Sequence, residues 1–180
     1  MSRPLRVVPY DPGWPGRFEA EAARLRVALG GTALAVEHVG STAVPGLAGK
    51  PVLDVAIAVA SDAAADACIA PLEALGYEHR GPYGEDPRRR YYVRDVSAAR
   101  VAQIHLYVMP AAAWHEKLAF RDALRADPAL AAAYAAEKLR VAEAVGWDKA
   151  AYSLAKGPFV ERVLAGLRAG QHTDPPSPAG

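Results

Sequence analysis

The run 52–59 is the feature of this sequence that most constrains its fold. It is apolar at every position except Asp54, and its length fits one β-strand. Strands that read as continuous apolar runs are typically buried on both faces. A carboxylate inside such a strand is costly unless a cation or hydrogen-bond donors compensate it. The run therefore predicts a central strand and marks Asp54 as a candidate functional residue.

Shorter runs predict the rest of the sheet. Residues 34–39 have the length and composition of a core strand, and a weaker strand begins at residues 77–80. Residues 91–93 and 101–108 predict an antiparallel hairpin joined by a polar connection at 94–100. These runs place most of the strands in the first part of the chain.

Helical periodicity dominates the remaining segments. Apolar residues recur at helical spacing before Gly30, and a helix is expected from about residue 62 to residue 75. From residue 111 to residue 168 the pattern predicts a C-terminal helical segment of three helices, with breaks near Asp127 and Gly146. Strands first and helices last predict an α+β domain with a mixed β-sheet flanked by helices.

Length and composition favour one intracellular domain. The chain of 180 residues suits a single domain, expected at residues 1–168, and the proline-rich residues 169–180 are expected to be disordered. No stretch reaches the roughly 18 apolar residues of a membrane span, and the N-terminus lacks an apolar leader, which predicts a cytoplasmic protein that binds no membrane. The single cysteine, Cys68, is expected to pack in the core.

Charge is balanced overall. Lys and Arg number 21 against 20 Asp and Glu, for a formal net charge of +1. This balance gives no global field for nucleic acid, and no aromatic and basic platform is visible, so nucleic acid is not expected as the main partner. Any anion site must be local.

The segment 37–54 contains the residues with the clearest chemistry. Gly40 and Ser41 follow a strand, where a missing Cβ lets backbone N–H groups approach a phosphate and a hydroxyl adds a donor. Lys50 lies between this turn and Asp54, and it can meet a phosphate or pair with the carboxylate. Asp54 either holds a magnesium ion or is a paired structural carboxylate.

This segment resembles the GrpB family of bacterial proteins. Residues 37–47 read EHVGSTAVPGL and are followed by Lys50-Pro51 and by Asp54 inside an apolar strand, as in the family signature. Further residues that look like family landmarks extend the resemblance over residues 5–168: Tyr10-Asp11-Pro12, Trp14, Phe18, Arg89-Arg90-Tyr91, His105, the stretch 114–128, Tyr152 and Lys156.

The resemblance implies a nucleotidyltransferase-like fold, similar to that of DNA polymerase beta. In that superfamily the glycine and serine bind a triphosphate and strand aspartates hold divalent metal, which implies phosphate binding by Gly40, Ser41 and Thr42 and a Mg²⁺ site at Asp54. The sequence departs from the pattern at Ala56, where a second acidic residue is usual, and the strand 101–108 presents His105 in place of a late aspartate. Two-metal chemistry normally takes more than one carboxylate.

Glu37 and His105 are the candidates for the missing catalytic groups. Either can serve as a metal ligand or a general base, although a buried, hydrogen-bonded His105 is an equally good interpretation. His38 and Glu37 alternate along their strand, so one of them at most faces the site, and Glu37 is preferred.

Cations elsewhere in the chain are candidates for further phosphate contacts. Arg89 and Arg90 match the geometry of phosphate groups, unless they belong to a solvated hairpin. Lys156 shares a helix face with Tyr152 and either returns to the cleft or extends into solvent.

Three functional hypotheses follow. The first is a magnesium-dependent nucleotidyltransferase acting on a nucleoside triphosphate and an acceptor that the sequence does not identify. The second is a degenerate nucleotidyltransferase fold that binds a nucleotide or other phosphorylated small molecule without turnover. The third is a partner module linked to coenzyme A synthesis, since GrpB-like domains resemble segments fused to dephospho-coenzyme A kinase. The chain has no P-loop motif, so it cannot supply that kinase activity itself.

Overall fold

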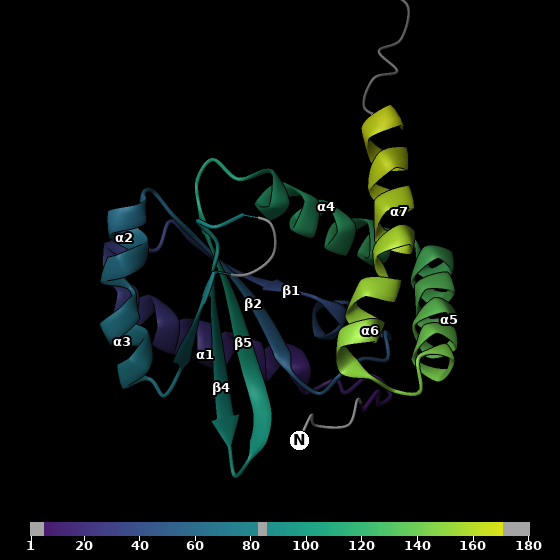
Figure 1. The fold of residues 1–180 in the computed structure, drawn as a ribbon, viewed down its shortest axis with the longest axis horizontal. Helices are drawn as coiled ribbons and strands as arrows, with labels where there is room; N and C mark the ends of the chain where they lie inside the picture. Colours follow the sequence, from purple (N-terminus) through teal and green to yellow (C-terminus); the bar gives the residue numbers. More distant parts are fainter. Residues whose placement is uncertain (1–5, 83–85, 171–180) are drawn as a thin grey trace, which may run out of the picture.

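The computed structural model describes residues 6–82 and 86–170 and contains a five-stranded mixed sheet with the order β1-β2-β5-β4-β3 (Figure 1). The central strands β2 and β5 are parallel, and every other neighbouring pair is antiparallel. The strands are β1 Ala35–Val39, β2 Leu53–Val59, β3 Glu78–Pro82, β4 Arg90–Val96 and β5 Ala99–Val108.

Helices cover both faces of this sheet. The helices α1, α2 and α3 pack on one face, while α4 crosses the other and α5, α6 and α7 group beside it (Figure 1). The helical elements are α1 Trp14–Leu29, η1 Gly30–Thr32, η2 Ser41–Ala43, α2 Asp62–Ala67, α3 Ile69–Ala74, α4 Ala112–Ala126, α5 Pro128–Ala144, α6 Lys149–Ala155 and α7 Gly157–Gly170.

Strand alternation divides β2 between two layers. Val55 and Ile57 are fully buried in the main core under α1 to α3. Asp54 and Ala56 point to the α4 face, because successive side chains of a strand alternate. Every residue of β2 except Asp54 is buried, which confirms the central strand expected from the apolar run.

A buried ion network ties α1 to the far strands. The Glu21 carboxylate on α1 accepts hydrogen bonds from the Tyr77 hydroxyl at 2.8 Å and from Arg94 at 2.7 Å. Arg24 also donates to this carboxylate, at 3.0 Å. The Glu21 side chain is only 6% exposed, so these donors compensate a charge that burial would otherwise disfavour.

The predicted α+β architecture is confirmed, with corrections to its boundaries. The helix expected at residues 62–75 is two helices that meet at Cys68, which is buried in the core as expected. The hairpin strands continue through most of the polar connection predicted at 94–100, because the turn needs only Ser97 and Ala98, both at positive φ.

The C-terminal segment contains four helices in place of the predicted three. The breaks at Asp127 and Gly146 are confirmed, and a further break separates α6 from α7 at Lys156. Helix α7 reaches Gly170, so it includes the first residues assigned to the disordered tail, and the rest of that tail, residues 171–180, lies outside the described residues. No helix in the described ranges is both long and apolar enough to cross a membrane.

Candidate functional site

The turn after β1 packs directly against Asp54. Gly40 has φ 71° and ψ −171°, a conformation that residues with a side chain rarely adopt. A Cβ on Gly40 would lie 2.8 Å from the Cγ atom of Asp54. The missing side chain lets the backbone pass beside the carboxylate, and the approach to a phosphate expected from the sequence stays a prediction.

A cavity of about 400 Å³ opens between this turn, the α4 face of the sheet and the helices α4, α6 and α7. Its floor is the pair β2 and β5, in which Asp54 lies opposite Gln103 and Ala56 opposite His105. Its wall is unusually cationic for a chain of balanced charge. Ser41, Lys50, Asp54, Arg89, His105, Lys117 and Lys156 are among the residues that line it.

Asp54 is the carboxylate on the cavity floor. It accepts a hydrogen bond from the amide of Gln103, and its Oδ1 atom lies 3.8 Å from Nε2 of His105. Burial alone would raise the pKa of Asp54, but His105, Lys117 and the Gln103 amide outweigh burial and lower this pKa to about 2. The carboxylate is therefore ionised at neutral pH.

His105 is held in one tautomer by Arg89. The arginine donates a hydrogen bond of 2.8 Å to Nδ1, and since a guanidinium has no acceptor, Nδ1 must be unprotonated. The ring proton then lies on Nε2, which faces Asp54. Burial and the charge of Lys117 lower the pKa of His105 to about 3, although Asp54 opposes the shift. A neutral His105 that donates toward Asp54 is a positioning group.

Lysines line the wall above the carboxylate. Burial lowers the pKa of Lys117, on α4, to about 8, against the opposing effect of Asp54. Burial also lowers the pKa of Lys156, whose Nζ lies 4.5 Å from the centre of the Tyr152 ring. Lys50 lies 5.0 Å from the same ring. Tyr152 thus holds two of the cations over the cavity through cation–π contacts.

The Ser41 hydroxyl accepts a hydrogen bond from a buried lysine. Lys138, on α5, is 1% exposed and donates to Ser41 Oγ at 3.1 Å and to the carbonyl oxygen of Ala48. Burial, with a smaller effect from Lys156, lowers the pKa of Lys138 to about 7. The lysine links both ends of the loop between β1 and β2, and so fixes the position of the hydroxyl.

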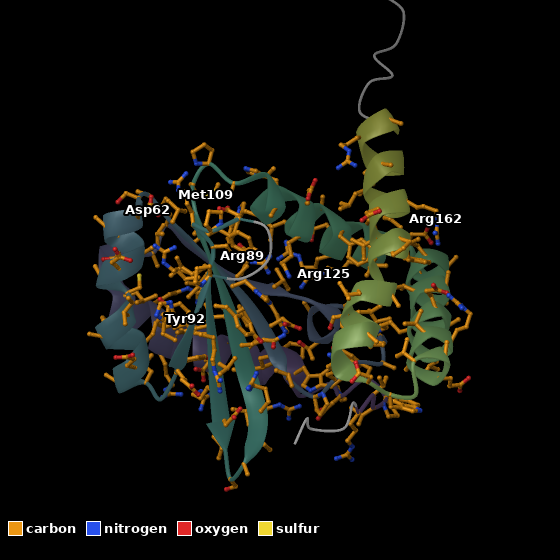
Figure 2. The ribbon with its side chains drawn as sticks, viewed as in Figure 1. Asp62, Arg89, Tyr92, Met109, Arg125 and Arg162 are labelled. Atoms are coloured by element: carbon orange, nitrogen blue, oxygen red, sulfur yellow. The ribbon has the colours of Figure 1, made fainter. Side chains whose placement is uncertain are left out.

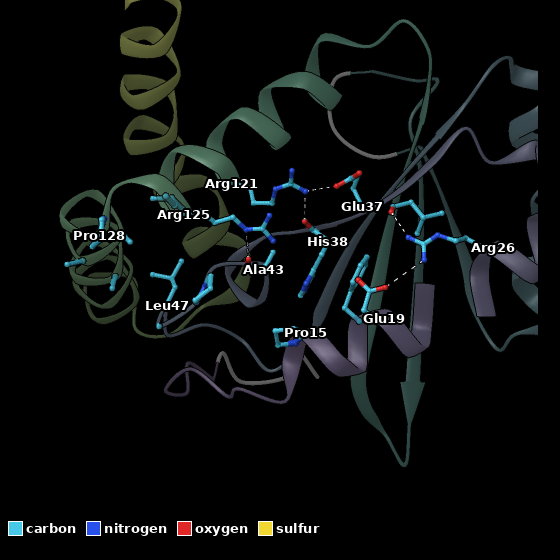
Figure 3. Close-up of a pocket in the computed structure, with 18 residues that line it drawn as sticks. Pro15, Glu19, Arg26, Glu37, His38, Ala43, Leu47, Arg121, Arg125 and Pro128 are labelled. Carbon is cyan, nitrogen blue, oxygen red and sulfur yellow. Dashed lines mark hydrogen bonds and ion pairs between the residues drawn. The ribbon is translucent and has the colours of Figure 1, made fainter. Parts of the chain in front are cut away.

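Three of the residues predicted for the site lie elsewhere. The Thr42 hydroxyl is buried and contacts His38 Nε2 at 2.9 Å, and Arg90 belongs to the opposite face, where it pairs with Asp62 and Asp66. Glu37 was preferred over His38 as the residue that faces the site, but it pairs with Arg121 at 2.7 Å and does not line this cavity. It lines a second, larger cavity of about 850 Å³ on the other side of the turn (Figure 3).

Comparison with known proteins places the chain in a family. The GrpB protein family matches residues 4–166. The chain belongs to the GrpB family. A relative from Pseudomonas aeruginosa, UPF0157 protein PA4798, is 39% identical over 163 residues, which are 89% of this chain and 66% of the relative. The dephospho-CoA kinase of Mycolicibacterium paratuberculosis is 34% identical over 188 residues, but the match covers only 44% of that protein.

Solved structures confirm the fold. The crystal structure of conserved protein GrpB from Enterococcus faecalis superposes with a TM-score of 0.79 at 32% identity, covering 91% of this chain and 99% of that one. The Cid1 poly(U) polymerase superposes with a TM-score of 0.53 at 17% identity, covering 83% of this chain and 49% of that one. The nucleotidyltransferase-like fold predicted from the GrpB resemblance is therefore shown, and the Cid1 likeness is one of fold alone.

The donors of this GrpB cavity fit a two-metal centre poorly. In the ranges that the structure describes, no three His, Cys, Asp or Glu side chains gather in a way that suits a metal ion. Asp54 has Ala56 beside it and Gln103 opposite, where further carboxylates would be needed. The charges of Lys117 and Lys156 already act on this carboxylate, and they compete with a metal cation. The Mg²⁺ site at Asp54 stays a prediction.

The sequence reasoning missed Gln103, Lys117 and Lys138. Gln103 carried a readable signal, because it is polar, lies two residues before His105 and so shares its strand face. Lys117 also carried a signal, because its spacing puts it on the same helix face as Phe120, Arg121 and Leu124. Lys138 gave no signal, because its role depends on where α5 packs against the loop before β2.

His38 makes the stability of this GrpB chain sensitive to acid. Its ring stacks on Phe18, and burial, helped by Arg125 and Arg121 and opposed by Asp54, lowers its pKa from 6.5 to about 4. Stability is therefore complete above pH 6.5 and falls as the pH drops toward 4, by up to about 3 kcal/mol. Denaturant unfolding across this range should show a smaller loss in His38→Gln than in the wild type. An unchanged loss would exclude His38 as its source.

Proposed function

We propose that the 400 Å³ cavity binds a nucleotide or another phosphorylated small molecule through its phosphate groups. The observation that supports this function is the convergence of Lys50, Arg89, Lys117 and Lys156 on one cavity. The chain as a whole has a net charge of only +1, so the cationic lining is a local feature of the cavity and not part of an overall positive charge. Such clusters attract anions and raise their local concentration.

The turn supplies the complementary donors. Gly40 begins the single helical turn of η2, whose first backbone N–H groups have no partner within the turn, and Ser41 presents its hydroxyl beside them. Lys138 donates a hydrogen bond to that hydroxyl and so fixes its position. A phosphate at this point would meet backbone donors, a hydroxyl and lysine side chains together. The nucleotidyltransferase-like fold of the GrpB family is consistent with a phosphorylated ligand here.

Nucleotidyl transfer requires more of this cavity than phosphate binding does. Two-metal transfer of this kind needs several carboxylates to hold the ions, and Asp54 has only Ala56 and Gln103 as neighbours where others would be needed. Turnover is tested by pyrophosphate release from nucleoside triphosphates over a panel of acceptors, with Asp54→Asn as the control. Release that depends on Asp54 would support an enzyme.

One group of relatives suggests a link to coenzyme A chemistry. The match to a dephospho-CoA kinase covers 87% of this chain, so domains of this kind occur within that enzyme. Dephospho-coenzyme A and coenzyme A are phosphorylated nucleotides, the class of ligand proposed for the cavity. Both compounds are therefore a second candidate ligand class for binding experiments. The relatives also keep open the hypothesis that the domain is a partner module in coenzyme A synthesis.

Calorimetric titration tests the proposal. The ligands are ATP, GTP, CTP, UTP, dephospho-coenzyme A, coenzyme A and inorganic tripolyphosphate. We expect Ser41→Ala and Lys156→Met each to weaken binding by about 10-fold, the usual effect of removing one hydrogen bond to a charged group. Arg80→Met, which removes an exposed cation that pairs with Glu78 on β3, should bind as the wild type does. Equal affinity in all the variants would contradict the site.

A further inference from the structure

The carboxylate of Asp54 carries a negative charge that its neighbours His105 and Gln103 do not balance. His105 is neutral, because its Nδ1 accepts from Arg89, and Gln103 contributes only a dipole. Lys117 lines the same cavity as Asp54, and its charge helps to lower the pKa of this carboxyl. A lysine is therefore present in the cavity where the superfamily pattern implies a metal.

Lys117 has no other carboxylate to balance. Within residues 6–82 and 86–170, Lys117 and Lys156 form no ion pair with an acidic side chain, Asp54 included, whereas the other charged residues named below are paired. Glu116, the other acidic residue of the cavity lining, pairs with Arg168 at 3.0 Å. Arg121 also lines the cavity, but Glu37 and Asp122 neutralise it. Asp54 is thus left among several lysines.

This charge arrangement selects among the forms of a polyphosphate ligand. Lys117 and Lys156 outnumber Asp54, so the cavity favours an anion and holds it more strongly when it carries more negative charges. A triphosphate without bound metal carries more negative charge than its magnesium complex. A magnesium ion brought in with the phosphates would also be repelled by the lysines that line the cavity.

We infer that the ammonium groups of Lys117 and Lys156 take the part of a divalent metal ion in this cavity, so that it binds polyphosphate groups in their metal-free form. The inference rests on the proposed phosphate-binding function. Lysine serves as a point charge toward phosphate, and a lysine on a rigid helix provides this charge without the several carboxylates that hold magnesium. Ligand binding is then independent of magnesium, and excess magnesium opposes it by forming the less charged complex.

The experiment is a calorimetric titration of ATP and of inorganic tripolyphosphate into the full chain, in EDTA and in excess magnesium. The wild type should bind both ligands in EDTA and bind them about 10-fold more weakly in excess magnesium. Lys117→Met should weaken binding in EDTA by about 10-fold, and Lys117→Arg, which restores the charge, should recover most of it. Arg80→Met, an exposed cation far from the cavity wall, controls for net charge.

Asp54→Asn separates the two interpretations of the carboxylate by the sign of its effect. The substitution keeps the shape of the side chain, so circular dichroism and thermal melting should show a folded protein. Removing a negative charge from a phosphate site should tighten ATP binding in EDTA by about 5-fold, whereas loss of a metal ligand would weaken binding in magnesium. Binding that appears only with magnesium, or is insensitive to Lys117→Met, overturns the inference alone. No binding under either condition overturns the proposed function as well.

Discussion

Gly40→Ala is expected to destabilise the protein by about 3 kcal/mol or more and to abolish ligand binding in the cavity. The backbone of Gly40 has φ 71° and ψ −171°, which disfavours any side chain, and the added methyl group would overlap the carboxylate of Asp54. Either the turn or Asp54 must move. Each movement separates Ser41 from the floor of the cavity.

A matched glycine distinguishes the two causes. Gly46 also has a positive φ, of 77°, but a Cβ there would meet nothing within 4 Å. Gly46→Ala should therefore show the backbone cost alone and keep ligand binding. Thermal or denaturant unfolding gives the difference in stability, and calorimetry gives the affinity. Equal losses of stability for the two variants would show that the contact with Asp54 has no energetic weight, and Asp54→Ala should partly restore the stability of Gly40→Ala.

Arg94→Met is expected to cost about 3 kcal/mol of folding free energy. The arginine donates to Glu21 at 2.7 Å, and the side chains of Arg94 and Glu21 are 18% and 6% exposed. Removing the cation leaves a buried carboxylate with less compensation, which costs more than the ion pair itself contributes. Tyr77 still donates to Glu21, but a hydroxyl supplies no charge.

The same carboxylate provides the control. Arg24 also pairs with Glu21, at 3.0 Å, but its side chain is 47% exposed. Arg24→Met should cost less than about 1 kcal/mol, the usual range of exposed pairs. Adding Glu21→Gln to Arg94→Met should recover much of the loss, since the uncompensated charge is then gone. Urea unfolding of these variants measures each difference, and similar losses for Arg24→Met and Arg94→Met would contradict the burial argument.

The sheet was largely predictable because its signals are local. The apolar run around Asp54 identified β2, and alternation placed Asp54 and Ala56 on one face. The turn at Ser97 and Ala98 was missed because neither residue type is typical of positive φ, and only strand pairing reveals that residues 94–100 continue the ladder. The extra helix break at Lys156 was hidden by the alanine-rich composition around it.

The candidate site was predictable only in part. Sequence placed Gly40, Ser41 and Asp54 in one segment, and the structure brings them together with Lys50, Arg89, His105 and Lys156. Arg90 was misplaced because adjacent residues of an extended chain face opposite sides, so it cannot share a wall with Arg89. Its partner Asp62 begins α2, the helix beside which Asp62 is labelled in Figure 2, away from α4. Lys117 was missed because its distance from Asp54 depends on how α4 packs across the sheet.

The most direct test of the phosphate site is a crystal structure of the protein soaked with ATP in EDTA. The account predicts electron density for the phosphate groups in the smaller cavity, within hydrogen-bond distance of Ser41 and of the ammonium groups of Lys117 and Lys156. Phosphate density in the larger cavity beside Arg125, with the smaller one holding only solvent, would contradict it.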